Sequence, residues 1–252
     1  MMKPIPLSKN QLKYLRSLQL KKYRLRHNAY IAEGNKLLIE LLQRSTSIQR
    51  IFVTQDWKDT TKLSLPENKI QIISLQDYKQ VSQLSTPPAV LAIVDMPKDE
   101  LSNDILYKNH CFVLDKVRDP GNLGTLLRIA DWFGMPYLIC SKDCVDCYNA
   151  KTVQASMGSI GSIPVFYEDL PDFFEKHPDL PIFAALLNGE NIAEVNFKEN
   201  GLILLGNESN GITPSLLSHP HHPITILGSG QVESLNVAIA GGIIAAQTFQ
   251  YK

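Results

Sequence analysis

The sequence predicts an α/β protein whose second half folds around a largely parallel sheet. Short apolar runs alternate there with segments of helical periodicity, a pattern typical of parallel strands joined by helices. In addition, three polar clusters each follow one of these apolar runs. Ligands bind in open α/β sheets in the crevice beyond the carboxyl ends of the strands, so the three clusters predict one composite site.

The first half predicts a smaller α/β unit. Leu12, Leu15 and Leu18 recur at helical spacing, and a second helical stretch is rich in leucine. The expected helices cover 8–24 and 35–44, and the expected strands cover 51–53, 70–73 and 89–94. A polar stretch follows the last strand. We therefore expect an N-terminal domain at 1–97, a linker at 98–108 and a C-terminal domain at 109–252.

Strand and helix alternate throughout the second half. The expected strands lie near 111–115, 137–141, 164–166, 182–187, 202–205 and 224–227, and the expected helices at 122–133, 149–158, 169–176, 213–218 and 235–250. The last helix holds Gly241 and Gly242, each costing about 1 kcal/mol relative to alanine. Another element is therefore expected to pack very close to it, in the same subunit or in a second one.

Composition indicates a folded protein without a membrane span. Hydrophobic residues make up 44% and charged residues 20%, as in globular proteins. The longest apolar stretch, 237–246, is about half the length that a membrane span needs. Because the N-terminus lacks the features of an export signal and the chain has 4 cysteines, we expect reduced thiols and a cytoplasmic location.

Basic side chains concentrate at the N-terminus, although the formal net charge is zero. Residues 1–32 contain no acidic residue, and Tyr14, Tyr23 and Tyr30 interleave with the cations. Cations with stacking groups can follow a phosphate backbone and hold a base. We expect RNA contacts from Lys21, Lys22, Arg24 and Arg26. A solvated helix face is the open alternative.

The first polar cluster is Asp119-Pro-Gly-Asn122, followed by Arg128. Proline and glycine favour a turn between strand and helix, and Asn122 is expected to cap that helix. The guanidinium of Arg128 is permanently charged and planar, which suits phosphates and oxyanions. A solvated surface arginine is the alternative for this residue.

The second cluster runs from Gly206 to Gly211. Gly206 allows close approach to the backbone, Gly211 suits a positive φ, and Glu208 is expected to hold loops together or bind a cationic group. The glycine spacing matches neither a phosphate loop nor a dinucleotide fingerprint.

The third cluster is Ser234-Leu-Asn236, which precedes the final helix. Ser234 is expected as its N-cap. Both polar side chains would then project from the first turn, where free N–H groups favour anions.

Together the clusters read Asn-x-Gly-x-x-x-Arg, Gly-x-Glu-x-x-Gly and Ser-Leu-Asn-Val. In this order they resemble the three motifs of the SpoU, or TrmH, group of SPOUT-superfamily RNA methyltransferases. Ala155-Ser-Met-Gly158 and Ala32-Glu-Gly34 extend the resemblance to nearly the whole chain. It implies methyl transfer from S-adenosylmethionine to a ribose 2′-hydroxyl of rRNA or tRNA by a homodimer that pairs through its C-terminal domain.

For the fold, the resemblance implies a C-terminal α/β domain with a deep trefoil knot around a mostly parallel sheet, preceded by a small α/β RNA-binding domain. Catalysis is implied at Arg128, Asn122, Glu208, Ser234 and Asn236. Cofactor contacts are implied at Leu187, Asn188, Gly206, Asn207, Gly211, Ile226, Leu227, Gly230, Ser234, Leu235 and Asn236. Arg128 is also expected to contact RNA, and no metal is expected.

Two alternatives stay open. Cys140, Cys144 and Cys147 have the C-x3-C-x2-C spacing of the iron–sulfur site in radical S-adenosylmethionine enzymes. Asp146 stands where those enzymes usually have an aromatic residue, so packing cysteines are favoured over an iron–sulfur or structural zinc site. The other alternative is an RNA-binding protein on a degenerate methyltransferase scaffold, against which the intact motifs argue.

Overall fold

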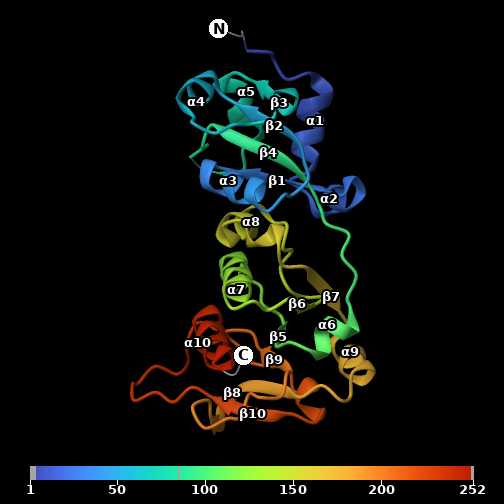
Figure 1. The fold of residues 1–252 in the computed structure, drawn as a ribbon, viewed down its shortest axis with the longest axis vertical. Helices are drawn as coiled ribbons and strands as arrows, with labels where there is room; N and C mark the ends of the chain where they lie inside the picture. Colours follow the sequence, from blue (N-terminus) through green and yellow to red (C-terminus); the bar gives the residue numbers. More distant parts are fainter. Residues whose placement is uncertain (1–3, 85, 251–252) are drawn as a thin grey trace. The chain divides into compact units, whose positions relative to one another are not determined.

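The computed structural model describes residues 4–84 and 86–250, and its contacts divide the chain into two compact units (Figure 1). The first unit runs through Lys98 and also takes Tyr148–Gly161. The second unit is Asp99–Cys147 together with the chain from Ser162 onward. The predicted α/β class is confirmed, and each unit has its own sheet.

The first unit has a mixed four-stranded sheet in the order β1-β4-β2-β3. Its strands are β1 (Ala29–Glu33), β2 (Ile48–Val53), β3 (Ile70–Ile72) and β4 (Val90–Asp95). β4 pairs antiparallel with both β1 and β2, whereas β2 and β3 are parallel. The sequence did not predict β1, because alanine and glutamate are poor strand formers and only tertiary pairing makes this segment extended.

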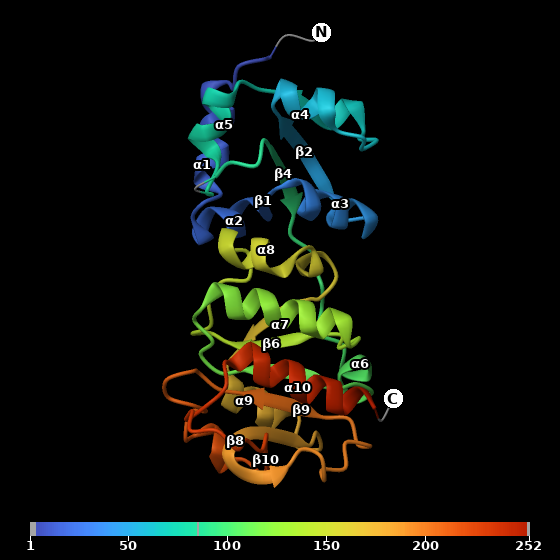
Figure 2. The ribbon, with the colours of Figure 1, turned by 90° about the vertical axis from the view of Figure 1, so that its left-hand side faces the viewer.

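Helices cover both faces of this sheet. They are α1 (Lys9–Ser17), α2 (Lys21–His27), α3 (Asn35–Gln43), α4 (Gln55–Thr60), α5 (Leu75–Val81) and α8 (Ala150–Ser156), with short 3-10 turns η1 (Glu67–Lys69) and η2 (Ser159–Gly161). Figure 2 shows α1 and α5 on one face and α3 and α4 on the other. Leu15, Tyr78, Phe52 and Ile93 join α1, α5, β2 and β4 in one core cluster.

The prediction of a single helix over 8–24 is wrong, because the helix is interrupted between α1 and α2. Arg24 occupies the break: its Nη1 donates to the carbonyl oxygens of Leu18 (2.9 Å) and Gln19 (2.8 Å), and the side chain is buried. A cation at these carbonyls stabilises the end of α1. Tyr30 is also buried, with its ring 4.8 Å from that of Tyr148, so the expectation that Tyr30 is free to stack on a base is wrong.

The second unit has an all-parallel six-stranded sheet in the order β10-β8-β9-β5-β6-β7. Its strands are β5 (Cys111–Leu114), β6 (Leu138–Ser141), β7 (Val165–Glu168), β8 (Ile182–Asn191), β9 (Leu202–Leu205) and β10 (His222–Thr225). Each strand expected from the sequence is present: β9 has the predicted ends, and the ends of the other five are shifted. The trefoil knot that the resemblance implies stays a prediction.

Two layers of helices enclose this sheet (Figures 1 and 2). They are α6 (Asn103–Tyr107), α7 (Pro120–Trp132), α9 (Leu170–Lys176) and α10 (Val237–Phe249), with a 3-10 turn η3 (Leu216–Ser218). α6 and α9 pack on Cys111, Val113 and Leu204 on one face. α7 and α10 cover the other. The helix expected over 213–218 is wrong: only η3 forms there.

The close approach expected at the final helix is confirmed within one subunit. A Cβ built on Gly241 would lie 2.6 Å from Leu126 Cδ2 of α7 and 3.1 Å from Leu205 Cδ1 of β9. A Cβ on Gly242 would meet Ile129 Cδ1 at 3.4 Å, an ordinary contact. None of the described helices is both long and apolar enough to cross a membrane.

The two glycines therefore predict opposite effects on stability. Gly241→Ala should lower the free energy of unfolding by about 1 kcal/mol, because overpacking exceeds the gain in helix propensity. Gly242→Ala should raise it by about 0.5–1 kcal/mol. Denaturant unfolding of both variants measures the difference. Equal stability of the two variants would contradict the packing described for Gly241.

Candidate functional site

The three polar clusters lie at the carboxyl end of the second unit's sheet. The loop 206–211 follows β9, the stretch 226–236 follows β10, and α7 begins six residues after β5 ends at Leu114. β5 and β9 are neighbours in the sheet, and β8 separates β9 from β10. Parallel strands place their carboxyl ends on one edge, so the clusters meet there.

Asn122 connects all three clusters through its side-chain amide. Its Nδ2 donates to Glu208 Oε1, and its Oδ1 accepts from Asn236 Nδ2 at 2.9 Å. Asn236 Oδ1 in turn accepts from the backbone N–H groups of Ala238 (3.0 Å) and Ile239 (3.3 Å) at the start of α10. One chain of hydrogen bonds thus runs from a helix N-terminus to a carboxylate.

Two helix caps differ from those expected. Asp119 rather than Asn122 caps α7, with its Oδ1 accepting from the Asn122 backbone N–H at 2.8 Å. Asn236 rather than Ser234 caps α10, which begins at Val237. In both cases the better-placed carboxylate or amide is the cap, and Asn122 keeps its side chain for the bridge between motifs.

The loop 206–211 closes on itself. Asn207 and Gly211 exchange backbone hydrogen bonds of 3.0 and 2.9 Å. The side-chain Nδ2 of Asn207 donates to the Lys116 carbonyl oxygen, and its Oδ1 accepts from the backbone N–H groups of Ser209 and Asn210. Gly211 has the positive φ expected, at +63°. A side chain at Gly206 would collide with the backbone of Gly211 and Ile212, so this glycine permits the loop's own closure.

A second close approach lies where β8 bulges beside β10. The pairing register jumps between Pro223 and Ile224. A Cβ on Gly189 would lie 2.7 Å from the backbone of Pro223. Thr225 Oγ1 also donates to the Leu187 carbonyl oxygen at 3.2 Å. Nothing in the sequence pattern singles out Gly189, since an isolated glycine in a strand has several explanations.

The expected cofactor residues border an exposed apolar rim. Leu187 is 73% exposed and Leu227 70% exposed, and Leu235 is also exposed. Unpaired apolar side chains beside backbone amides and carbonyls at strand ends suit an adenosine ring with a thioether chain. The residues present therefore fit S-adenosylmethionine. The other expected contacts lie in β8, after β9 or after β10, and their role stays a prediction: Asn188, Gly206, Asn207, Gly211, Ile226, Gly230, Ser234 and Asn236.

Arg128 and Ser234 stand apart from the bridge. Both are exposed, and neither side chain forms a hydrogen bond or ion pair with another residue in the described part of the chain. Arg128 projects from α7 four residues before the exposed Trp132. Its guanidinium therefore remains available to an anionic partner.

The structure also brings in residues that sequence reasoning missed. Asp115, buried at the end of β5, accepts from the Thr213 N–H at 2.6 Å. Lys116 Nζ donates to Thr213 Oγ1 at 2.9 Å, and Lys116 has a positive φ of 54°. These bonds fasten the chain after the 206–211 loop to β5. The feature of the sequence that could have identified them is the charged pair Asp115-Lys116 directly after an apolar strand.

The three cysteines of the C-x3-C-x2-C array are buried. Cys144 Sγ donates to the Leu114 carbonyl at 3.2 Å and lies 3.5 Å from Ser141 Oγ. A hydrogen bond from Cys140, opposed by burial, lowers the pKa of Cys144 to about 7. In the described part of the chain, no three His, Cys, Asp or Glu side chains are placed to hold a metal ion.

Known protein families match both halves of the chain. Residues 109–246 match the SpoU rRNA Methylase family, and residues 9–92 match the MRM3-like substrate binding domain. The 23S rRNA (guanosine(2553)-2′-O)-methyltransferase RlmP of Bacillus subtilis is 32% identical over 250 residues, covering 96% of this chain and 98% of the relative.

Solved structures agree with these matches. A TrmH-family protein of Porphyromonas gingivalis is 33% identical with a TM-score of 0.85, covering 98% of this chain and 100% of that one. An AdoMet-bound rRNA methyltransferase of Sinorhizobium meliloti is 28% identical with a TM-score of 0.83, covering 99% and 98%. Motifs, fold and full-length similarity thus agree, and the chain belongs to the SpoU rRNA methylase family.

Proposed function

We propose that this protein transfers a methyl group from S-adenosylmethionine to a ribose 2′-hydroxyl of ribosomal RNA. The observation that carries the proposal is the Asn122 bridge, which joins all three family motifs at one sheet edge. Relatives that match nearly the whole chain act on rRNA. A methyl group on the ribose 2′-oxygen distinguishes this function from both alternatives, a degenerate RNA-binding scaffold and a radical enzyme using Cys140, Cys144 and Cys147.

The rim of exposed leucines and strand-end backbone would hold the cofactor. When bound, S-adenosylmethionine supplies an electrophilic methyl group and leaves as neutral S-adenosylhomocysteine. Asn122, Glu208 and Asn236 fix the loops that form this rim. The protein's remaining task is to position the ribose and assist its hydroxyl.

In this proposal the guanidinium of Arg128 contacts the ribose 2′-oxygen. A ribose hydroxyl is barely ionised at neutral pH, and a guanidinium stays protonated, so Arg128 stabilises developing negative charge rather than accepting the proton. Its fork can hold a substrate phosphate beside the 2′-oxygen, and a phosphate oxygen or water then takes the proton. Ser234, exposed before the α10 cap, lies within the third motif and would orient the ribose.

Arg128→Ala should reduce methyl transfer to rRNA by about 10²–10³-fold, because one preorganised electrostatic contact is lost. Arg128→Lys should recover little, since lysine lacks the planar fork. Calorimetric affinity for S-adenosylmethionine should stay unchanged in both variants. Lys176→Ala, which removes a cation from α9 on the opposite sheet face, serves as the control. Near-normal turnover by a folded Arg128→Ala protein would refute the role.

We also propose a homodimer through α7 and α10, which lie side by side in Figure 2. Trp132 is 83% exposed, and Ile239, Ile243 and Phe249 are exposed on the neighbouring helix. Contiguous apolar surface of this kind marks interaction sites in soluble proteins. Ile239 and Ile243 are four residues apart and share one helix face.

The double variant Ile239→Glu, Ile243→Glu should therefore sediment as a monomer where the unmodified chain sediments as a dimer. Charges buried without partners at an interface cost several kcal/mol. Ile5→Glu, at an exposed isoleucine of the first unit, should leave the assembly unchanged. A monomeric unmodified protein at micromolar concentration would contradict the proposal.

The basic N-terminal segment is proposed to bind RNA phosphates through Lys21, Lys22 and Arg26. Arg24 differs from the other three, because its guanidinium is buried at the end of α1. We therefore assign Arg24 a structural role rather than an RNA contact.

The triple variant Lys21→Gln, Lys22→Gln, Arg26→Gln should weaken binding to an rRNA fragment. It should also flatten the dependence of binding on salt, because fewer counterions are released. Arg24→Gln should instead lower the melting temperature. Filter binding across a salt series, with thermal melts, separates the two effects. An unchanged salt slope in the triple variant would leave these cations as a solvated face.

A further inference from the structure

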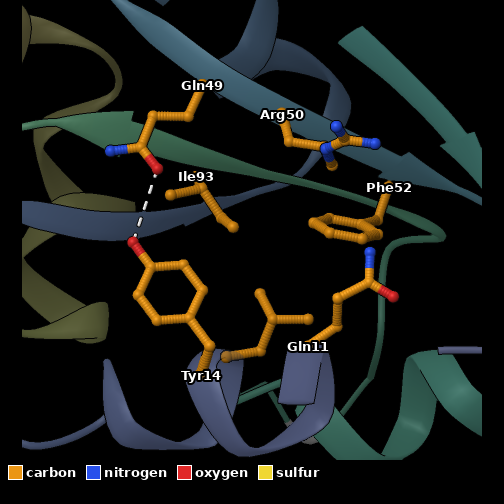
Figure 3. A pocket seen from close by; sticks show the side chains of 7 residues that line it. Gln11, Tyr14, Gln49, Arg50, Phe52 and Ile93 are labelled. Carbon is orange, nitrogen blue, oxygen red and sulfur yellow. Dashed lines mark hydrogen bonds between the residues drawn. The ribbon is translucent and has the colours of Figure 1, made fainter. Parts of the chain in front are cut away.

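The first unit contains a cavity of about 290 Å³ between α1 and the strands β2 and β4 (Figure 3). Leu15, Phe52 and Ile93 form its apolar floor and are buried in the core. Four polar side chains complete its lining: Gln11, Tyr14, Gln49 and Arg50. An apolar floor with a polar rim suits a flat group that has hydrogen-bonding edges. The volume is at the small end for ligand pockets, about 300–1,000 Å³, which favours a single base over a dinucleotide.

The α1 side of the rim is held in place by hydrogen bonds. Gln11 Oε1 accepts from the Ser8 N–H at 3.0 Å, and Gln11 Nε2 donates to Gln71 Oε1 at 2.8 Å. One lone pair of this oxygen and one amide hydrogen are therefore engaged, and the second amide hydrogen of Gln11 is left to donate.

Hydrogen bonds also hold the opposite side of the rim in place. Gln49 Oε1 accepts from the Tyr14 hydroxyl at 3.4 Å (Figure 3), and Gln49 Nε2 donates to Asp95 Oδ1 at 2.5 Å. Asp95 also accepts from Ser47, so this carboxylate is engaged from two sides. In Figure 3 the Gln49 amide nitrogen points away from Arg50 and Phe52, so Gln49 holds Tyr14 in place and adds no donor to the cavity.

Arg50 adds the strongest donors. It is exposed on β2, and its side chain makes no hydrogen bond or ion pair within the described part of the chain. In Figure 3 its guanidinium lies at the cavity, above Phe52. Its five N–H groups and the remaining amide hydrogen of Gln11 make a rim that gives hydrogen bonds more readily than it accepts them.

Aromatic rings continue from the cavity along α1 and α2. The Tyr14 ring meets the exposed His27 ring edge-on at 5.0 Å, and His27 stacks on Tyr23 at 6.4 Å. Such a row beside cations is the arrangement that proteins use to stack successive bases of single-stranded RNA. α1 itself carries basic residues and no acidic one.

We propose that this cavity holds one unpaired base of the RNA substrate, with guanine preferred over adenine; the proposal rests on the proposed RNA function. The Hoogsteen edge of guanine presents two acceptors, N7 and O6, whereas adenine presents one acceptor and the N6 donor. A rim of leftover donors therefore matches guanine and opposes the N6 amino group of adenine.

The test uses the full-length protein and fluorescein-labelled RNA heptamers UUUGUUU, UUUAUUU and UUUUUUU. Fluorescence anisotropy should show tighter binding of the guanine heptamer, by about tenfold over adenine, as one bidentate contact provides. Arg50→Gln should reduce this ratio to near one. Tyr14→Leu should weaken all three heptamers, since a stacking surface is lost.

Arg26→Gln is the matched control, because it removes an exposed arginine of the same unit outside the cavity. It should weaken all three heptamers by one factor and leave the guanine ratio intact. Equal binding of guanine and adenine by the unmodified protein would overturn the proposal. So would Arg50→Gln lowering both affinities by the same factor.

Methyl transfer to rRNA is measured in parallel for the unmodified protein. Guanine preference without any methyl transfer would overturn the proposed reaction while supporting the cavity. Methyl transfer without guanine preference would do the reverse. The two proposals therefore fail by different measurements.

Discussion

The second unit depends on one side-chain amide. Asn122 both donates to Glu208 and accepts from Asn236, so the hydrogen bonds of one side chain link three segments that are far apart in the sequence. A side-chain amide donates through its nitrogen and accepts through its oxygen at the same time, and it carries no charge. A carboxylate in this position would repel Glu208, and an apolar residue would leave both partners unpaired.

Glycine makes the surrounding close approaches possible. Gly206, Gly189 and Gly241 each stand where a Cβ would meet backbone or packed core atoms. At Gly206 and Gly189 the neighbour is backbone, which cannot rotate away as a side chain can. The segments that carry the apolar rim therefore cannot accept a larger residue at these glycines, whereas the exposed leucines of the rim are not confined by packing.

Sequence reasoning identified the strands of the second unit and the three clusters because both depend on local pattern. Pairing between side chains far apart in the chain was not available to it. The assignment of Asn236 rather than Ser234 as a helix cap depends on where α10 begins, and the pattern leaves that open by two residues.

Other misses have the same origin. α4 and α5 are short, and their N-caps Thr54 and Ser74 were the usable signal. Arg24 was grouped with surface cations because composition does not report burial. The residues of the bridge and the cofactor rim came from resemblance to a family, whereas the cavity beside Tyr14 needed three-dimensional neighbours.

The segment Tyr148–Gly161 has a consequence for how the chain can be divided. It leaves the second unit after Cys147, adds α8 to the first unit beside β1, and returns at Ser162. The chain therefore passes between units three times, and no single cut yields two complete pieces. A fragment starting at Asp99 would carry α8 without the strand it packs on, and a fragment ending at Lys98 would expose Tyr30. The first unit is therefore incomplete without a segment that lies in sequence between the two parts of the second unit.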